Sequence, residues 1–130
     1  MLQLENRLTK ARDFNLLLKY GQWISGRFLR IKWLKLAKIE DYFPKKEDMD
    51  KFKLQLRLAL VVGVKVSKSA VKRNRLKRQM REAARLLIKD NRLLNGYYLM
   101  LMAQKEVLDK NYADISEEIK LLLGKIKLLK

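Results

Sequence analysis

The densest group of chemically active side chains lies in residues 65–81, KVSKSAVKRNRLKRQMR. This segment has eight cations and no acid, and the first carboxylate after it is Glu82. On a helix, like charges four residues apart repel, and cations in the first turn face the positive end of the helix dipole. Residues 65–81 combine both unfavourable arrangements, as expected where a bound anion supplies the missing negative charge. We therefore predict phosphate binding, in preference to a solvated charged face, by Lys65, Lys68, Lys72, Arg73, Arg75, Lys77, Arg78 and Arg81.

Side chains for other kinds of chemistry are scarce in this sequence. It contains no His and no Cys, which excludes a Ser-His or Cys-His couple, a thiolate nucleophile and a zinc finger. The segment GVKVSKS, residues 63–69, lacks the GxxxxGKS or GxxxxGKT spacing of a phosphate-cradling loop. The acids near the basic segment are not grouped at metal-ligand spacing, so a two-metal nuclease site has little support. We expect no catalytic residue and no metal site in the chain.

Charge and length point to one domain with a polyanionic partner. The 130 residues include 31 Lys and Arg against 14 Asp and Glu, a formal net charge of +17. Such an excess repels itself in a folded domain and is typical of nucleic-acid-binding proteins. Because 48% of the residues are hydrophobic and only one is Pro, the chain can still fold. It has neither a signal-peptide core nor about 18 consecutive apolar residues, so we expect a cytoplasmic protein without a membrane span.

The basic segment must be presented by a helix. Ser67 or Ser69 can cap its start, and the helical pattern continues to about Arg92. The apolar residues of this helix fall within an arc of about 100° and predict its buried face. They are Leu76, Met80, Ala83, Ala84 and Leu87. The opposite face carries Asn74, Arg75, Arg78, Arg81, Arg85 and Lys89.

A short helix and a strand precede the basic helix. The helix is expected over residues 10–20, with Thr9 as its N-cap and Gly21 as its end. From residue 25 to 36 the apolar pattern changes to period two, which predicts a strand, and a further short strand fits residues 21–28. One face of the longer strand carries Leu29, Ile31 and Trp33. The other face would hold a nucleic-acid strand if it is open, or else form the solvated side of an antiparallel sheet; it carries Phe28, Arg30, Lys32 and Leu34.

The remaining pattern completes an α+β fold. Residues 37–52 contain the only Pro and five acids, and predict a mixed-charge loop. A strand over 53–64 is expected to begin near a sheet edge and to end more deeply buried, and a buried strand covers 97–103. The last helix is capped by Asp114 or Ser116, and its end, KLLLGKIKLLK, would pack in the core or lie on an anionic membrane. We predict a single small domain, residues 1–130, with three helices and a mixed sheet of about four strands, in the order helix, strand, strand, helix, strand, helix.

Two stretches of the sequence resemble the protein subunit of bacterial ribonuclease P. In LRLALVVGVKVSKSAVKRNRLKRQMREAAR, residues 56–85, an apolar strand ends at Lys65, and a Val-Ser-Lys link leads to Arg-Asn-Arg, Lys-Arg and Arg-Glu-Ala. The N-terminal NRLTKARDFNLLLKYG, residues 6–21, resembles the family's Arg-Leu pair, followed by a short helix with Asp-Phe and a closing Gly. The resemblance covers most of the chain, and its specific part is the Arg-Asn-Arg helix with the strand before it.

The resemblance implies two RNA-binding surfaces. The catalytic RNA would be bound by Arg73, Asn74, Arg75, Lys77, Arg78 and Arg81, with Lys65, Lys68, Lys72 and Arg85 completing the set. A cleft between the first helix and the sheet would receive the single-stranded 5′ leader of precursor tRNA, lined by Phe14, Leu18, Phe28, Arg30 and Lys32. Leu18 and Lys32 stand where the family often has aromatics, so leader contact is expected to depend more on charge than on stacking. The family fold also contains a left-handed crossover between parallel strands, against the right-handed default.

The function that the resemblance implies is that of the protein component of the ribonuclease P ribonucleoprotein. In this family the RNA holds the catalytic Mg²⁺ and hydrolyses the phosphodiester bond that releases the 5′ leader, while the protein aids substrate affinity and metal binding. The expected partners are the ribonuclease P RNA and precursor tRNA, with a monomeric protein in a 1:1 complex and no cofactor bound by the protein alone. Two alternatives stay open. A small basic ribosomal protein would bind ribosomal RNA without preference for a leader, and an autonomous nuclease would cleave without added RNA.

Overall fold

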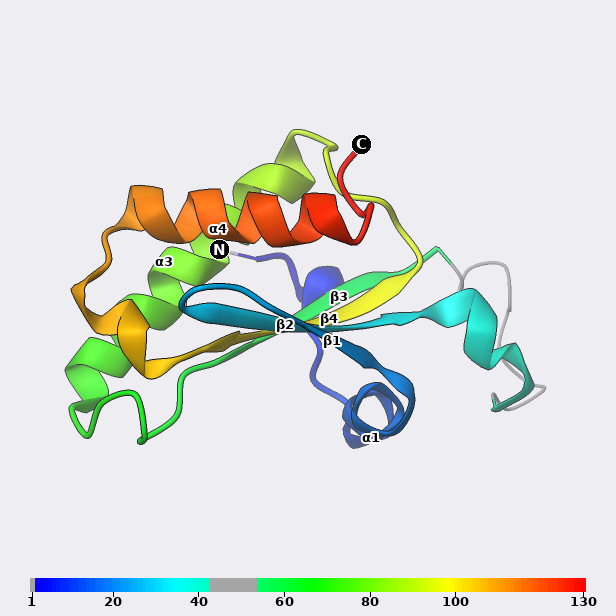
Figure 1. Cartoon of the computed structure of the whole chain (residues 1–130). Coiled ribbons are helices and arrows are strands. Elements are labelled where there is room, and N and C mark those ends of the chain that lie inside the picture. Colours follow the sequence, from blue (N-terminus) through cyan, green and yellow to red (C-terminus); the bar gives the residue numbers. More distant parts are fainter. Residues whose placement is uncertain (1, 43–53) are drawn as a thin grey trace.

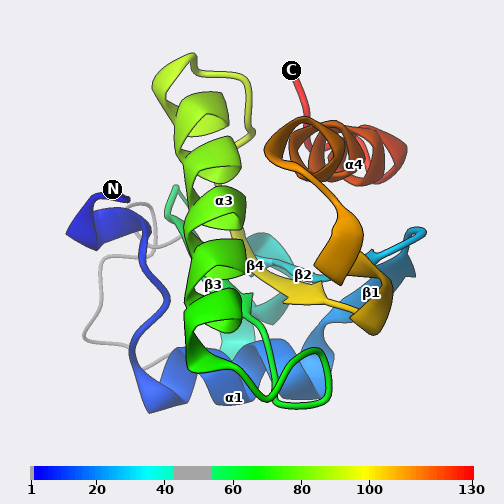
Figure 2. The same cartoon turned by 90° about the vertical axis from the view of Figure 1, so that its left-hand side faces the viewer.

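The computed structural model describes residues 2–42 and 54–130 of the chain (Figure 1). In these residues three α-helices surround one sheet: α1 (Ala11–Tyr20), α3 (Ala70–Lys89) and α4 (Tyr112–Lys125). Helices α3 and α4 lie together on one face of the sheet, and α1 crosses the opposite face (Figures 1 and 2). The inner strands are therefore covered on both sides.

The sheet is mixed and has the strand order β1-β2-β4-β3. The central strand β4 (Tyr97–Ala103) pairs antiparallel with β2 (Leu29–Lys35) and parallel with β3 (Leu56–Val61). At one edge, β1 (Gln22–Ser25) pairs antiparallel with β2. The predicted α+β class, the mixed sheet of four strands and the buried strand over residues 97–103 are confirmed.

Two apolar clusters hold these layers together. The larger cluster, the main core, lies between the sheet and the α3–α4 pair, and includes Leu29 of β2 and Leu76 of α3. The smaller cluster lies under α1 and includes Leu17. Strand β4 contributes to both because its side chains alternate, with Leu99 in the main core and Tyr98 in the smaller cluster. Burial on both faces explains why the sequence of β4 is a continuous apolar run.

The connection from β3 through α3 to β4 crosses in the left-handed sense. In Figure 1 both strands run from right to left with α3 above the sheet, and in Figure 2, which faces the ends of the strands, β4 lies to the right of β3. Parallel strands are joined by a right-handed crossover in nearly all proteins, and the spacing of this sequence indicates no exception. The handedness agrees with the family resemblance.

Helix α3 follows its sequence pattern closely. Ser69, one of the two predicted caps, accepts a backbone N–H of the first turn, and all the predicted apolar residues are buried. The helix ends at Lys89 and not near Arg92, because Asn91 adopts a left-handed conformation with φ of 55°. The turned chain then lets the Arg92 N–H donate to the Leu87 carbonyl at 2.9 Å.

The other two helices start at different residues from those predicted. Helix α1 begins after Lys10, whose side chain makes no capping hydrogen bond, so the prediction of Thr9 as N-cap is wrong. Its predicted end is confirmed, since the Gly21 N–H donates to the Leu17 carbonyl at 2.9 Å.

Helix α4 is capped by Asn111, so the predicted caps Asp114 and Ser116 are wrong. The Asn111 side chain accepts the Asp114 N–H at 2.9 Å, and the Asp114 carboxylate accepts the Asn111 N–H at 3.3 Å. In this reciprocal box Asp114 is the third helical residue, which satisfies two backbone donors with one pair of side chains.

The strand predicted over residues 25–36 is divided by a turn, and the further short strand is confirmed as β1. In the turn, the carboxylate of Glu118 on α4 accepts the backbone N–H groups of Arg27 and Phe28, both at 2.9 Å. This contact holds Phe28 in the main core. Its predicted place beside Arg30, on the face covered by α1, is therefore wrong.

The segments on either side of the predicted loop also differ from expectation. The loop predicted over 37–52 begins with a 3-10 helix, η2 (Leu36–Tyr42), in which Ile39 is buried; the rest of that loop lies outside the described residues. Strand β3 is an edge strand and ends before Val64, which is 67% exposed. The predicted deeper burial at the end of this strand is wrong, because the chain leaves the sheet there to enter α3.

Candidate nucleic-acid interface

The polar residues of α3 and of the link before it form one surface, here called the basic face. Its exposed members are Lys65, Lys68, Lys72, Asn74, Arg75 and Arg78, and its half-buried members are Arg73, Lys77, Arg81 and Arg85. The helix presents them outward because its apolar stripe packs into the main core. All the residues predicted to bind the catalytic RNA therefore lie on α3 or on the link directly before it.

The positive charge of the basic face is largely uncompensated. In the part of the chain that the structure describes, the ion pair between Arg85 and Glu82 is the only one made by a cation of this face. Arg73 Nη1 donates to the Ser67 carbonyl at 2.9 Å, and Arg75 Nη2 lies 3.5 Å from the Leu108 carbonyl of η3 (Lys105–Asp109). Each guanidinium has five N–H donors, so both keep donors for a ligand.

Arg85 is different from the rest of the basic face. Its Nε and Nη2 donate to the two carboxylate oxygens of Glu82, at 2.9 Å and 2.6 Å. This bidentate hydrogen bond lowers the pKa of Glu82 and raises the pKa of Arg85. An RNA phosphate would have to compete with Glu82 for this guanidinium.

Arg81 connects the basic face to the opposite side of the sheet. It lines a shallow hollow on α3 together with Val71, Asn74, Lys77 and Arg78. It also lines a groove with Phe14 of α1, between the N-terminal segment and the edge strand β3. The groove residues are Leu2, Arg7, Leu8, Thr9, Phe14, Leu58, Ala59, Leu60 and Arg81. The Arg81 side chain therefore lies where α3 meets the N-terminal segment, α1 and β3.

Strand register places three further side chains on the sheet face that α1 covers. Arg30 of β2 pairs with Met102 of β4, and Met102 pairs with Val61 of β3, so the three side chains form a row on one face. Met102 and Val61 pack, half-buried, against the same cluster as Phe14. We call Phe14, Arg81 and this row the α1-face groove. It combines the apolar side chains of Phe14, Val61 and Met102 with two arginines, Arg81 and Arg30.

Leu18 and Lys32, two of the predicted cleft residues, lie at the C-terminal end of α1. Leu18 is 52% exposed and can contact a ligand. Lys32 is only 8% exposed, and its Nζ donates to the Leu18 carbonyl at 2.7 Å. Lys32 therefore attaches α1 to β2, and its predicted place on the open surface of the cleft is wrong.

Trp23 of β1 is a residue of this face that the sequence interpretation missed. It pairs with Lys32 in the sheet and is 38% exposed. The Arg30 guanidinium carbon lies 4.2 Å from the centroid of its ring, and Lys32 Nζ lies 5.3 Å away. The period-two pattern would have placed Trp23 beside these cations only if the position of the turn between β1 and β2 had been known.

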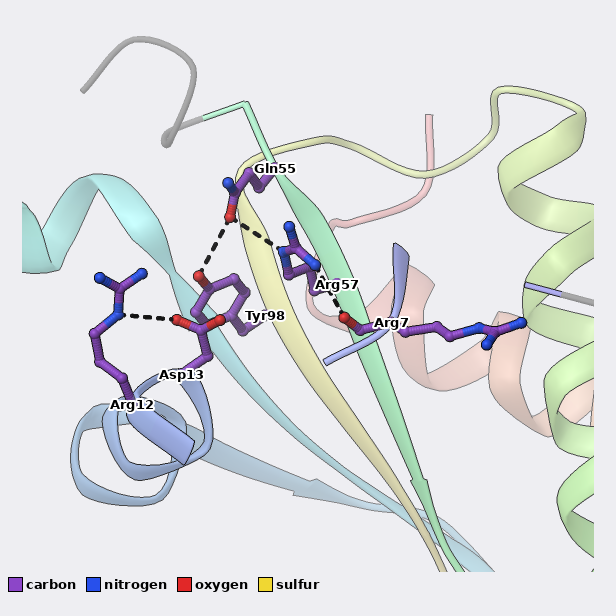
Figure 3. Close-up of polar contacts among 6 residues, drawn as sticks. All are labelled: Arg7, Arg12, Asp13, Gln55, Arg57 and Tyr98. Atoms are coloured by element: carbon purple, nitrogen blue, oxygen red, sulfur yellow. Dashed lines mark hydrogen bonds and ion pairs between the residues drawn. The ribbon is translucent and has the colours of Figure 1, made fainter. Parts of the chain in front are cut away.

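A buried polar network fixes α1 on the sheet (Figure 3). Asp13 is 2% exposed and its Oδ1 lies 3.4 Å from Arg12 Nε. The Tyr98 hydroxyl donates to Gln55 Oε1, which also accepts from Arg57 Nε, both at 3.3 Å. Burial raises the pKa of Tyr98, and the neighbouring Asp13 carboxylate raises it further. Because Phe14 follows Asp13 directly, this network also sets where the aromatic ring meets the groove.

Helix α4 uses its apolar side chains inside the fold. Ile115, Ile119, Leu122 and Leu123 are all buried in the main core, so the alternative of a membrane-surface helix finds no open apolar stripe here. None of the described helices is long and apolar enough to span a bilayer. Among the described residues, no three or more of His, Cys, Asp and Glu are grouped so that they could hold a metal ion.

Known proteins resemble this chain along nearly its whole length. The family model described as Ribonuclease P matches residues 2–127. A relative from Synechococcus sp., named Ribonuclease P protein component, is 35% identical over 129 residues, which cover 99% of this chain and 87% of the relative. A relative of the same name from Pseudanabaena sp. is 31% identical over 129 residues, with 99% and 97% covered.

Solved structures share the fold. The RNase P protein from Staphylococcus aureus aligns with a TM-score of 0.72 at 22% identity, covering all of this chain (100%) and 96% of that one. The RNase P protein from Thermotoga maritima aligns with a TM-score of 0.68 at 24% identity, covering 93% and 97%. The family match and the relatives confirm the family that the motifs around Arg73–Arg75 indicate. The chain belongs to the ribonuclease P protein family.

Proposed function

We propose that this chain is the protein component of a bacterial ribonuclease P, which binds the catalytic RNA through the basic face and the 5′ leader of precursor tRNA in the α1-face groove. The observation that carries the proposal is the position of Arg81, which lines both surfaces. Because Arg81 belongs to both surfaces, a substrate strand bound at the basic face can continue into the groove.

The basic face suits a phosphate backbone. Its exposed cations have no carboxylate partner in the described structure, so they can bind RNA phosphates. Binding then releases the counterions that are condensed on the RNA. The positive end of the α3 dipole adds to the field around Lys68 and Lys72. Arg75 and Arg78 can form bidentate hydrogen bonds with phosphate oxygens, which Lys cannot.

The α1-face groove suits a single strand better than a duplex. Phe14 and the exposed Leu18 offer apolar surface to unstacked bases, and Arg81 and Arg30 offer positive charge to the phosphates between them. In a duplex the bases are stacked on one another and could not reach Phe14. The 5′ leader is the single-stranded part of the precursor, so the groove distinguishes it from mature tRNA.

Phosphodiester hydrolysis and its Mg²⁺ are assigned to the RNA subunit in this proposal, as the family implies. The protein residues described above bind and orient RNA. We further propose that one monomer joins one RNA subunit and that the complex acts in the cytoplasm.

Reconstitution tests the function directly. The purified chain is mixed with a bacterial ribonuclease P RNA and precursor tRNA, at a Mg²⁺ concentration too low for the RNA alone to cleave. The expected result is restored cleavage at the mature 5′ end, and no cleavage by the protein alone. Cleavage without added RNA would instead identify an autonomous nuclease, and preferential binding to ribosomal RNA without rescue would identify a ribosomal protein.

A further inference from the structure

We propose that Trp23 and Arg30 form a nucleotide-binding site at the β1 edge of the sheet, where they hold one nucleotide of single-stranded RNA. The proposal rests on the proposed function, because it extends the leader path beyond the α1-face groove. In the site, the base packs against the exposed Trp23–Arg30 stack and the Arg30 guanidinium donates to the adjoining phosphate.

The two side chains form a stack that the sheet itself builds. The guanidinium carbon of Arg30 lies 4.2 Å from the indole centroid, within the range of a cation–π contact. Trp23 pairs with Lys32 and Ser25 pairs with Arg30, so Trp23 and Arg30 are diagonal neighbours on adjacent strands. Diagonal neighbours in an antiparallel pair share a face and are within reach of aromatic and long side chains. Strand register therefore fixes the contact.

The Arg30 guanidinium has hydrogen-bonding capacity that the described structure does not use. Its Nε is buried and has no hydrogen-bond partner there. Buried donors in native proteins nearly always have a partner, so an unpaired one requires an explanation. Because Nε itself is buried, a phosphate would be bound through the Nη1 and Nη2 N–H groups, for which the described structure contains no hydrogen bond. The planar guanidinium matches the geometry of a phosphate.

Trp23 supplies the surface for a base. A side chain of this size on an edge strand would usually be covered, yet 38% of Trp23 is exposed. Bases of single-stranded RNA stack on aromatic rings and on guanidinium planes, and their phosphates bind nearby cations. Trp23 and Arg30 bring these features together, an exposed aromatic ring beside a guanidinium.

The site lies on the extension of the groove. The row from Val61 through Met102 to Arg30 crosses three strands, and Trp23 belongs to the fourth. Three strand spacings amount to about 14 Å. A strand of RNA that has reached the β3 edge at Val61 therefore has about 14 Å to cross before it meets Trp23.

The two tryptophans of the chain allow a direct test. Trp33 lies on the opposite face of the sheet, packed against the main core and 6.5 Å from the Tyr97 ring. The variant Trp33→Phe retains Trp23 as its only tryptophan, and Trp23→Phe retains Trp33. Titration with a short oligouridylate should quench the emission of the Trp33→Phe protein and leave that of the Trp23→Phe protein unchanged. Absent quenching in Trp33→Phe, or equal quenching in both, overturns the proposal.

Affinity measurements test the two roles separately. Trp23→Ala should weaken oligouridylate binding about 5- to 150-fold, the range for loss of one base–aromatic stack, while Trp23→Phe should keep most of the affinity. Arg30→Gln should weaken binding and make the slope of log affinity against log salt shallower by about 0.7, as for one lost phosphate contact on a single strand. Unchanged affinity in both Trp23→Ala and Arg30→Gln overturns the proposal. Circular dichroism identifies a variant that fails to fold. In that case the titration of Trp33→Phe, which keeps Trp23 and Arg30, tests the proposal.

Reconstituted ribonuclease P separates this inference from the proposed function. If Trp23→Ala restores cleavage of leader-bearing precursor as well as the unmodified chain does, the nucleotide site is wrong and the proposed function stands. If the unmodified chain restores no cleavage but oligouridylate still quenches Trp23, the nucleotide site stands and the proposed function is wrong.

Discussion

Arginine and lysine have different tasks in the basic face. Lys68 and Lys72 are exposed point charges at the start of α3, whereas Arg75 and Arg78 present planar groups from its outer side. A guanidinium matches two phosphate oxygens at once, so an Arg to Lys exchange on this helix should reduce affinity even though the charge is kept. RNA binding by the basic face can therefore be tested one side chain at a time.

Replacing Arg75 and Arg78 together with Ala should weaken binding to the ribonuclease P RNA. Each lost phosphate contact should make the slope of log affinity against log salt shallower by about 0.7 to 0.9, because fewer counterions are released. The measurement is a filter-binding titration at several salt concentrations. The control is Lys120→Ala with Lys125→Ala, which removes the same charge from exposed positions of α4. An unchanged slope in the α3 variant would remove both arginines from the interface.

Glu82→Gln should strengthen RNA binding. The exchange releases Arg85 from its bidentate partner and raises the net charge by one, so the salt slope should steepen by up to about 0.9 if Arg85 then contacts a phosphate. The matched control is Glu117→Gln, an exposed carboxylate on α4. Equal effects of the two exchanges would show that only net charge matters and that Arg85 makes no contact of its own.

At the scale of elements, α1 is the wall of the groove, and polar contacts from three strands determine its position. Lys32 of β2 binds its C-terminal end, while Tyr98 of β4 and Gln55 beside β3 belong to the network around Asp13 (Figure 3). Buried polar groups of this kind are costly unless they are paired, so they fix one arrangement of the helix. The groove is therefore formed before RNA binds.

Phe14→Ala should impair binding of leader-bearing precursor far more than binding of mature tRNA. Loss of one base–aromatic contact costs about 1 to 3 kcal/mol, and under the proposed function mature tRNA, which lacks the leader, does not occupy the groove. The two affinities are compared in the reconstituted complex. Leu16→Ala is the matched control, because Leu16 is also a half-buried apolar residue of α1 but does not line the groove. Equal losses on both RNAs in Phe14→Ala would contradict a role in leader binding.

The Tyr98 hydroxyl should make the attachment of α1 sensitive to alkaline pH. Its pKa is raised above the ordinary value of 10.0, chiefly by burial, so its contribution to stability is complete below pH 10.0 and is lost as pH rises further. At neutral pH, Tyr98→Phe should lower the free energy of unfolding by about 1 kcal/mol, the net worth of a typical hydrogen bond. The difference between the two proteins, measured by urea unfolding at several pH values, should shrink above pH 10.0. A constant difference would contradict this role.

For the whole molecule, the dominant property is the net charge of +17. Repulsion among so many cations opposes the compact state, and the basic face concentrates part of that repulsion on α3. A bound polyanion relieves it, so RNA binding and protein stability are linked. The free protein is then expected to be less stable than the protein in its complex.

Inorganic phosphate should therefore stabilise the free protein. An anion that binds the folded state at 100 times its dissociation constant adds about 2.7 kcal/mol, and the thermal midpoint rises accordingly. The rise should be larger in phosphate than in sodium chloride of equal ionic strength, and smaller in the Arg75 and Arg78 double variant. The same rise in both salts would indicate general screening and no anion site.

Local patterns were sufficient for much of the fold. The apolar face of α3, the end of α1 at Gly21 and the extent of β4 all follow from residue spacing, because helix and strand periods act over a few neighbouring residues. The sequence narrows the cap of α3 to Ser67 or Ser69, and the structure selects Ser69. The family resemblance rested on the same kind of local motif. The basic face, which is one continuous stretch of sequence over α3 and the link before it, could be predicted for this reason.

The sequence by itself determined the type of most elements and which face of α3 is charged, and the family resemblance implied the left-handed crossover. Only the tertiary structure decided that a turn divides the strand predicted over residues 25–36, that Phe28 belongs to the main core, that Lys32 binds α1 and that Trp23 meets Arg30. Each of these depends on which elements pack on each face of the sheet. The alternation of side chains along a strand does not specify which face is covered. A side chain's partner across the sheet is fixed by long-range pairing, which short-range spacing does not specify.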